Sequence, residues 1–229
     1  MRTTIVIIIG VLFGHLGQAQ IYEGGFFLGG SNLIGDVGAT NYISPNAFAV
    51  GGLIKWNRSP RHAWRASMTY SNFEAKDFQS DDPRRKKRDY FMEQRMLEVS
   101  IGLEFTFFDF NMHYGGFIST PYLYTGISVI GHNDSYFKNG KQTLENTRSF
   151  AFGIPMTVGY KIRVSEHILL AAEIGLRYTF TDGLDGSMPA NDERKEVYAF
   201  GNINNNDWYT FTGITLTYTF GRKPCYCNF

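Results

Sequence analysis

Glu173 and Arg177 place a carboxylate and a guanidinium inside an otherwise apolar stretch, ILLAAEIGLRYTF, at Ile168–Phe180. Such groups could catalyse a reaction, line an ion pathway or form a salt bridge. Every second residue from Ile168 is apolar, and both charges belong to the alternate set. This period of two predicts a strand with one apolar face and one face that accepts charge. A soluble sandwich and a membrane barrel with a polar lumen both satisfy this pattern.

The same alternation recurs along the chain and predicts eight strands in all. They lie in stretches that begin near Glu23, Asn46, Trp64, Met96, Pro121, Phe150, Ile168 and Trp208. The charges set against the apolar faces are four of each sign: Glu23, Lys55, Arg65, Glu98, Glu104, Lys161, Glu173 and Arg177. The interior of an eight-stranded barrel is only wide enough for side chains to fill. We therefore predict a packed lumen network of salt bridges in preference to a conducting pore or catalytic carboxylates.

His132, Asp134 and Ser135, in GHNDSY, are the residue types of a hydrolase triad close together in the sequence. A triad is defined by geometry, which proximity along a loop does not supply. The chain also has no G-x-S-x-G or H-E-x-x-H motif. We predict no enzyme activity, no cofactor and no metal site.

A basic run, Arg84–Arg88, follows Asp81 and Asp82 in a long polar segment. It could contact anionic lipid or an acidic partner, but the flanking acids offset much of its charge and favour a solvated loop tip.

The first 19 residues have the pattern of a signal peptide cut after Ala19, with Arg2 followed by an apolar run from Ile5 to Phe13. Cleavage removes Arg2 from a chain of net charge +1, so the mature chain is near neutral and nothing indicates nucleic-acid binding. No later segment approaches the ~20 apolar residues of a membrane helix, so any membrane crossing must use strands. Aromatic content of 16% and 25 glycines suit a small membrane barrel with interfacial aromatic girdles.

Connection lengths favour the barrel over the sandwich. Short links lie near 57–61, 109–119 and 164–167, and long polar ones at 31–45, 74–95, 132–149 and 181–207. The fold prediction is all-β: an eight-stranded antiparallel transmembrane β-barrel at residues 20–221, with short periplasmic turns and long extracellular loops, in the outer membrane and in contact with its lipid. Residues 222–229 then form a periplasmic C-terminal tail. Its cysteines, Cys225 and Cys227, are too close in sequence for an unstrained mutual disulfide.

Four segments, EGGFFLGGSNLIGDVG, RRKKRDYFMEQRMLEVSIGLEF, TPYLYTGI and TFTDGLDG, together resemble the PorG family of Bacteroidota outer-membrane proteins, which belong to the type IX secretion and gliding machinery. The likeness extends from Glu23 to the last strand and departs at TDGLDG, where a bulkier T-D-Y-L-D-D is expected. The resemblance implies association with the periplasmic ring of the lipoprotein GldK (PorK) and GldN (PorN), and with other type IX translocon components. In the tail, Arg222, Lys223, Cys225 and Cys227 are the predicted docking residues.

The functional prediction is therefore a non-catalytic component of the type IX protein secretion system. A small porin-like channel, which needs an open lumen, and an adhesin-type barrel, which uses its long loops, remain the alternatives.

Overall fold

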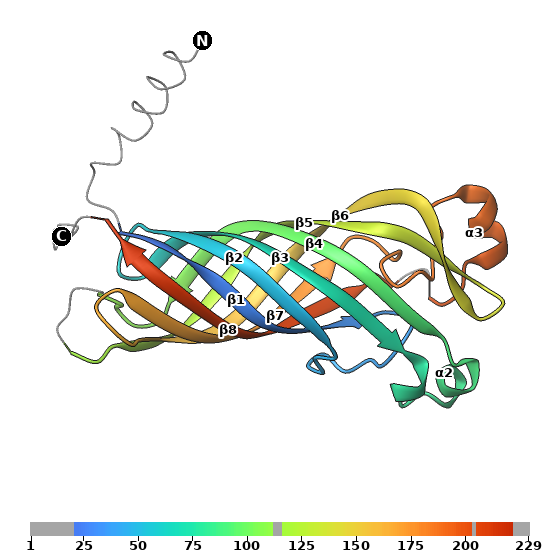
Figure 1. The fold of residues 1–229 in the computed structure, drawn as a ribbon, viewed down its shortest axis with the longest axis horizontal. Helices are drawn as coiled ribbons and strands as arrows, with labels where there is room; N and C mark the ends of the chain where they lie inside the picture. Colours follow the sequence, from blue (N-terminus) through green and yellow to red (C-terminus); the bar gives the residue numbers. More distant parts are fainter. Residues whose placement is uncertain (1–20, 112–115, 203–204, 222–229) are drawn as a thin grey trace, which may run out of the picture.

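The computed structural model describes residues 21–111, 116–202 and 205–221 and folds them into one closed barrel of eight antiparallel strands (Figure 1). The predicted signal peptide, 1–19, and the predicted tail, 222–229, lie outside the described residues. The strands are β1 Ile21–Ile34, β2 Ala47–Asn57, β3 His62–Lys76, β4 Phe91–Thr106, β5 Ser119–Lys138, β6 Lys141–Arg163, β7 Ile168–Thr179 and β8 Trp208–Phe220. Within the described ranges, three short helices lie in the connections: η2 Asp77–Gln79, α2 Pro83–Arg88 and α3 Asp192–Tyr198.

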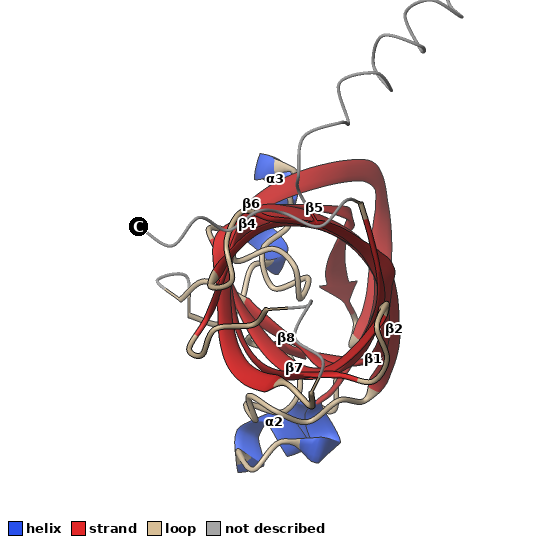
Figure 2. Ribbon diagram, turned by 90° about the vertical axis from the view of Figure 1, so that its left-hand side faces the viewer, coloured by secondary structure: helices blue, strands red, loops and turns tan. Residues whose placement is uncertain are grey.

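Each strand pairs with the next one along the chain, and β8 pairs with β1 to close the ring seen end-on in Figure 2. The closing ladder runs from Tyr22 opposite Phe220 to Ile34 opposite Trp208. The predicted all-β fold with eight antiparallel strands is confirmed. Closure leaves every strand with two neighbours and removes the free edges of an open sheet. Among the described residues, no helix is long and apolar enough to cross a membrane.

The two faces of the strands have different compositions. In β4 the outward residues from Leu97 to Phe105 are apolar at every second position, whereas Glu98, Ser100 and Glu104 point inward and are buried. The other strands repeat this pattern, and the outward residues include large exposed side chains such as Phe26, Ile127 and Phe152. An apolar outer wall around a polar interior is the arrangement of barrels that span a lipid bilayer.

The two ends of the barrel differ in their connections. The links 58–61, 107–118 and 164–167 lie at the end where the described chain starts and finishes, which we call the turn end. The links 35–46, 77–90 and 180–207, which carry α2 and α3, lie at the opposite end, which we call the loop end (Figure 1). In bacterial barrels short turns face the periplasm and long loops face outward. The turn end thus corresponds to the side that the sequence analysis predicts to be periplasmic.

The prediction of a long loop at 132–149 is wrong. β5 and β6 continue through this segment as a hairpin that extends beyond the barrel and turns at Asn139 and Gly140. Both turn residues have positive φ, 50° and 79°, which a two-residue type I′ turn requires and which Asn-Gly adopts readily. The Asn-Gly pair was the available signal for this hairpin, and the polar character of its flanks concealed it.

Candidate functional site

The eight predicted lumen charges all lie inside the barrel, and each is at most 5% exposed. They come from six strands, because each stands at an inward position of the two-residue alternation. The structure brings them together in the half of the lumen nearer the turn end, and we call this set of residues the charge network. Its members are Glu23, Lys55, Arg65, Glu98, Glu104, Lys161, Glu173 and Arg177.

Glu104 is the centre of the charge network. Its Oε2 lies 2.7 Å from Lys55 Nζ and 3.8 Å from Arg65 Nη1, and its Oε1 accepts a hydrogen bond of 2.8 Å from Lys161 Nζ. Glu23 lies 3.8 Å from Lys55 and accepts hydrogen bonds from two strand side chains, Asn57 Nδ2 at 2.9 Å and Thr217 Oγ1 at 3.0 Å. Two acids thus share the cations of three strands.

Arg65 and Glu173 form a bidentate salt bridge, one layer farther from the turn end. Arg65 Nη1 and Nη2 donate to the two carboxylate oxygens of Glu173 at 2.7 and 2.8 Å. Tyr122 Oη donates to Glu173 at 2.6 Å, and the Arg65 guanidinium lies 4.8 Å from the ring centre of Tyr124. Parallel hydrogen bonds of this kind fix both side chains in orientation as well as position.

Glu98 and Arg177 form the pair of the charge network that lies farthest from the turn end. Arg177 Nε lies 3.2 Å from Glu98 Oε2, and Tyr209 Oη donates to the same oxygen. The Arg177 guanidinium also lies 4.8 Å from the ring centre of Phe211. Its position requires Gly175, because a Cβ there would stand 1.9 Å from Arg177 Nη1.

The pairing of these charges stabilises the barrel. Charges taken out of water must be paired and hydrogen-bonded, and here all four acids meet cations or hydroxyl donors. Within the described ranges, no group of three or more His, Cys, Asp or Glu side chains could hold a metal ion. The charge network thus joins strands on opposite sides of the barrel through salt bridges.

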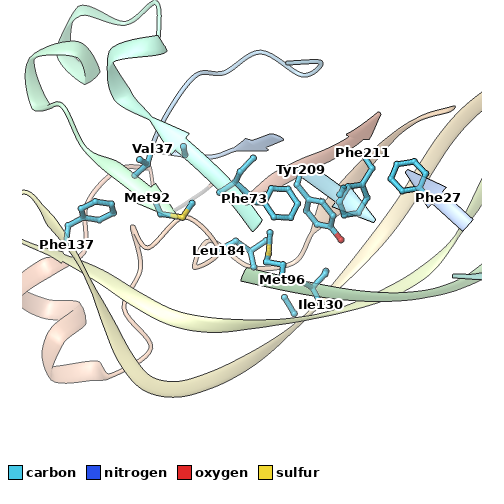
Figure 3. Packing of buried hydrophobic residues seen from close by; sticks show 14 of the residues in the cluster. Phe27, Val37, Phe73, Met92, Met96, Ile130, Phe137, Leu184, Tyr209 and Phe211 are labelled. Atoms are coloured by element: carbon cyan, nitrogen blue, oxygen red, sulfur yellow. The ribbon is translucent and has the colours of Figure 1, made fainter. Parts of the chain in front are cut away.

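The half of the lumen nearer the loop end is filled by apolar side chains, a feature that the sequence analysis missed. Phe73, Tyr209 and Phe211 contact one another with ring centres 5.5–5.8 Å apart, and Phe27 packs edge-on against Phe211 (Figure 3). The cluster, which we call the apolar plug, consists of Phe27, Leu33, Val37, Ala49, Leu53, Phe73, Ala75, Met92, Met96, Ile130, Phe137, Ala151, Leu184, Tyr209 and Phe211. The sequence shows aromatic residues at alternating positions. It does not show which of them point inward, because the lipid-facing outer wall is made of the same residue types.

Leu184 belongs to the long 180–207 link and is fully buried among the residues of the plug. The link is held by its own carboxylates: Asp207 accepts from the backbone N–H of Leu184 at 2.8 Å, and Asp185 accepts from those of Asp36 and Val37 at 2.5 and 3.1 Å. The segment TDGLDG therefore folds inward over the lumen, between the strands and the 35–46 link.

Burial shifts the titration of these loop carboxylates. Loss of hydration, with the negative charges of Asp185 and Asp36 nearby, raises the pKa of Asp182 to about 7. Burial also raises the pKa of Asp185, and it raises the pKa of Asp207 well above its ordinary value, with the charges of Asp185 and Asp182 adding to the effect. Packing of the loop thus shifts the titration of all three acids to higher pH than in an exposed loop.

The basic run is not simply a solvated loop tip. It forms α2, whose N-terminus is capped by Asp82. Arg85 donates to the carbonyl oxygens of Gly35 and Gly38, and Arg88 donates to Asp77 at 2.7 Å and to the carbonyl of Asp36. Helical spacing turns these two arginines toward the 35–46 link. They attach α2 to its neighbour, and the remaining three residues of the run are exposed.

The triad-like residues lie in the β5–β6 extension and are not arranged as a triad. His132 Nδ1 lies 3.9 Å from Asp134 Oδ1, but Asp134 Oδ2 accepts from Ser149 and the Ser135 hydroxyl accepts from Gln142. A β-bulge between Asn133 and Ser135 disrupts the local register. The predicted docking residues, Arg222, Lys223, Cys225 and Cys227, lie outside the described residues.

A closed eight-stranded antiparallel barrel with an apolar wall and a filled polar and aromatic interior defines the class: an outer-membrane β-barrel protein. Residues 2–229 match the family model described as a domain of unknown function, DUF6089, and the chain belongs to that family. A search of curated proteins found no match.

Solved structures with similar folds include outer-membrane proteins of several bacteria. A major outer membrane protein from Thermus thermophilus is 10% identical, with a TM-score of 0.48, over 89% of this chain and 100% of that one. The outer membrane protein OprG from Pseudomonas aeruginosa is 11% identical, with a TM-score of 0.42, over 90% and 99% of the two chains. At these values the likeness carries no statement about function.

Proposed function

We propose that this chain is a non-catalytic outer-membrane component of the type IX protein secretion system that associates with the periplasmic ring of GldK (PorK) and GldN (PorN). The type IX system is proposed because the sequence resembles the PorG family from Glu23 to the last strand. The observation in the structure that supports the proposal best is the filled lumen. A barrel whose interior is occupied by the charge network and the apolar plug acts through surfaces that other molecules bind.

The turn end offers such a surface. Arg61 and Asp109 form an exposed salt bridge at 2.5 Å, and Phe110 N–H donates to the carbonyl of Pro60 at 3.0 Å. These bonds join the β2–β3 link to the start of the β4–β5 link, and we call this surface the turn-end platform. Exposed aromatic residues on the second link, Phe108 and Phe117, add apolar area of the kind that protein interfaces use.

The predicted tail lies outside the described residues, and its place in the chain supports the same proposal. It follows β8, which ends at the turn end beside the start of β1. Arg222, Lys223, Cys225 and Cys227 would thus enter the compartment that holds the family's ring. We propose the tail as the principal docking element and the turn-end platform as the secondary one.

The test is a pull-down of the full chain from native membranes in a gentle detergent, with the bound proteins identified. The wild type should capture GldK and GldN. A variant truncated after Gly221 should still insert and fold but capture less of both proteins and secrete less type IX cargo. Capture of GldK and GldN by an Arg61→Ala/Asp109→Ala variant measures the contribution of the platform separately from that of the tail. If deletion of the whole protein leaves cargo secretion and gliding unchanged, the proposal is wrong.

The alternative functions predict other results. A channel would give ion conductance in planar bilayers, and an adhesin would lose binding to surfaces or cells when its loop-end hairpin is shortened at Asn139–Gly140. Either result without capture of ring proteins would replace the proposal.

A further inference from the structure

The backbone pairing of β4 with β5 ends before the two strands do at the loop end, and side-chain hydrogen bonds of Gln94 and Gln142 join them beyond that point. The last backbone pair of these strands is Met96 with His132. Beyond it β4 continues with β3 as far as Lys76 opposite Phe91, while β5 continues with β6 as far as Lys138 opposite Lys141. The separation leaves a hollow of about 490 Å³ in the outer wall, which we call the β4–β5 hollow. Its lining includes Tyr70, Arg95, Leu97, Gly131, Arg148 and Phe150.

Strand register arranges the lining in two tiers. Tyr70, Leu97, Gly131 and Phe150 are partners across four neighbouring strands and form the lower, apolar tier. Gly131 makes the floor of the hollow: a Cβ at this position would stand 3.3 Å from the Phe150 ring. Phe150 itself is 74% exposed on the outer wall. This tier is continuous with the lipid-facing surface.

Arg95 and Arg148 form the upper tier, one outward position nearer the loop end. On β4 the outward residues from Phe105 to Leu97 are apolar, and Arg95 is the first charged one beyond them. On β6 the outward residues from Tyr160 to Phe150 are apolar, and Arg148 follows them in the same way. The two arginines therefore mark the level at which the apolar band of the outer leaflet ends.

Both guanidinium groups lack a neutralising partner among the described residues, where neither forms a salt bridge. The nearby carboxylates are engaged elsewhere. Glu93 accepts a hydrogen bond of 2.6 Å from Asn72, and Asp134 accepts one of 2.9 Å from Ser149. Two exposed cations thus stand over an apolar hollow at the edge of the bilayer.

We propose that the β4–β5 hollow binds a phosphorylated lipid of the outer leaflet. Its phosphate lies between Arg95 and Arg148, and an acyl chain lies across Leu97 and Gly131 beside Phe150. Guanidinium groups match the geometry of phosphate oxygens and form charge-assisted hydrogen bonds with them. The occupant must carry both an anion and an acyl chain, because the cations stand at one side of the hollow and the other side opens onto the lipid-facing wall. The inference is independent of the proposed secretion function.

The test uses the full chain, purified in detergent and incubated with equal amounts of monophosphoryl lipid A and its dephosphorylated form. Native mass spectrometry measures which lipid remains bound. The wild type should prefer the phosphorylated lipid by about tenfold or more, as charged hydrogen bonds of this kind predict. Arg95→Gln/Arg148→Gln should reduce the preference to about twofold or less, on the same basis. The matched control, Lys86→Gln/Lys87→Gln, removes two exposed charges from α2 and should keep the preference for the phosphorylated lipid.

Two further arms test the lipid part of the proposal. Gly131→Leu fills the floor and should weaken retention of the phosphorylated lipid while both arginines remain. An excess of inorganic phosphate should displace it only slightly, because phosphate lacks the acyl contact. Equal retention of the two lipids by the wild type, an equal loss in the α2 control, unchanged retention by Gly131→Leu, or full displacement by phosphate would each overturn the proposal.

Discussion

The two halves of the lumen are filled by different means. The half nearer the turn end is closed by long charged side chains that all come from strands and pair with one another. The half nearer the loop end is closed by aromatic and aliphatic side chains together with Leu184, which comes from a loop. Hydrophobic contacts are non-directional, so a loop can supply them wherever it packs. Buried charges need partners in fixed positions, which strand register provides.

The two halves meet at Tyr209 and Phe211. Tyr209 donates to Glu98 in the charge network and packs against Phe73 in the apolar plug. Phe211 packs against the same plug and lies under the Arg177 guanidinium. The side chains of neighbouring inward positions on β8 thus connect both kinds of packing. The difference between the halves predicts that a single charge change is costlier than a single apolar truncation.

The largest effect is expected from Glu104→Gln. The change leaves Lys55 and Lys161 without their shared carboxylate, and a buried charge without its partner costs ~3–5 kcal/mol. The free energy of unfolding in urea, measured in lipid vesicles, checks this value. The control removes both members of another pair, Arg65→Met/Glu173→Leu, and should cost less because no charge is stranded. A larger loss in the control would show that the network is not governed by pairing.

A smaller effect is expected from Leu184→Ala in the apolar plug. Truncation of a buried leucine costs ~2–5 kcal/mol, and we expect the lower part of that range because the loop can settle into the space. The 180–207 link should become more sensitive to protease while the strands stay folded. Val197→Ala, at an exposed position of α3, is the matched control and should change stability by less than ~0.5 kcal/mol. Equal protease sensitivity in all three proteins would contradict the plug.

Gly159→Ala tests the close packing around the charge network. A Cβ at this position would stand 2.3–2.6 Å from the ring and hydroxyl of Tyr122, whose hydroxyl donates to Glu173. Overpacking of this kind costs ~1–3 kcal/mol. Combining it with Tyr122→Ala should add little, because the ring that the new Cβ would meet is then already absent. Additive losses in a double-mutant cycle would mean that Gly159 acts through another contact.

The smallest effect is a dependence of loop packing on pH. Because the folded pKa of Asp182 is raised from an ordinary value near 3.8 to about 7, the folded loop binds more protons than the open loop between these values. Loop stability is therefore greatest below about pH 4 and declines as pH rises toward 7. Hydrogen exchange of the 180–207 link should quicken over this range beyond its intrinsic increase. Asp182→Asn should reduce the change, and Asp185 and Asp207, whose pKa values are raised in the same direction, supply the rest. A loop that tightens as pH rises would contradict the assignment.

The fold was predictable because alternation with a period of two fixes the direction of every side chain once one face is known. Glu173 and Arg177 identified the inward face of β7 in this way, and the same argument placed the other six charges. The apolar plug was not predictable by that route, since Phe27, Phe73 and Phe211 are of the same type as lipid-facing residues. Leu184 was less accessible still, because its burial depends on a loop held by backbone hydrogen bonds to Asp185 and Asp207.

The lumen is filled from end to end, and single-channel recording in planar bilayers tests whether this filling blocks ions. The purified full chain should show no stable conductance, because the charge network closes the lumen even where the loop end opens. Leu184→Ala should remain silent for the same reason. Reproducible conductance steps in the wild type, altered by Arg65→Ala or Glu98→Gln, would contradict this account and favour the channel.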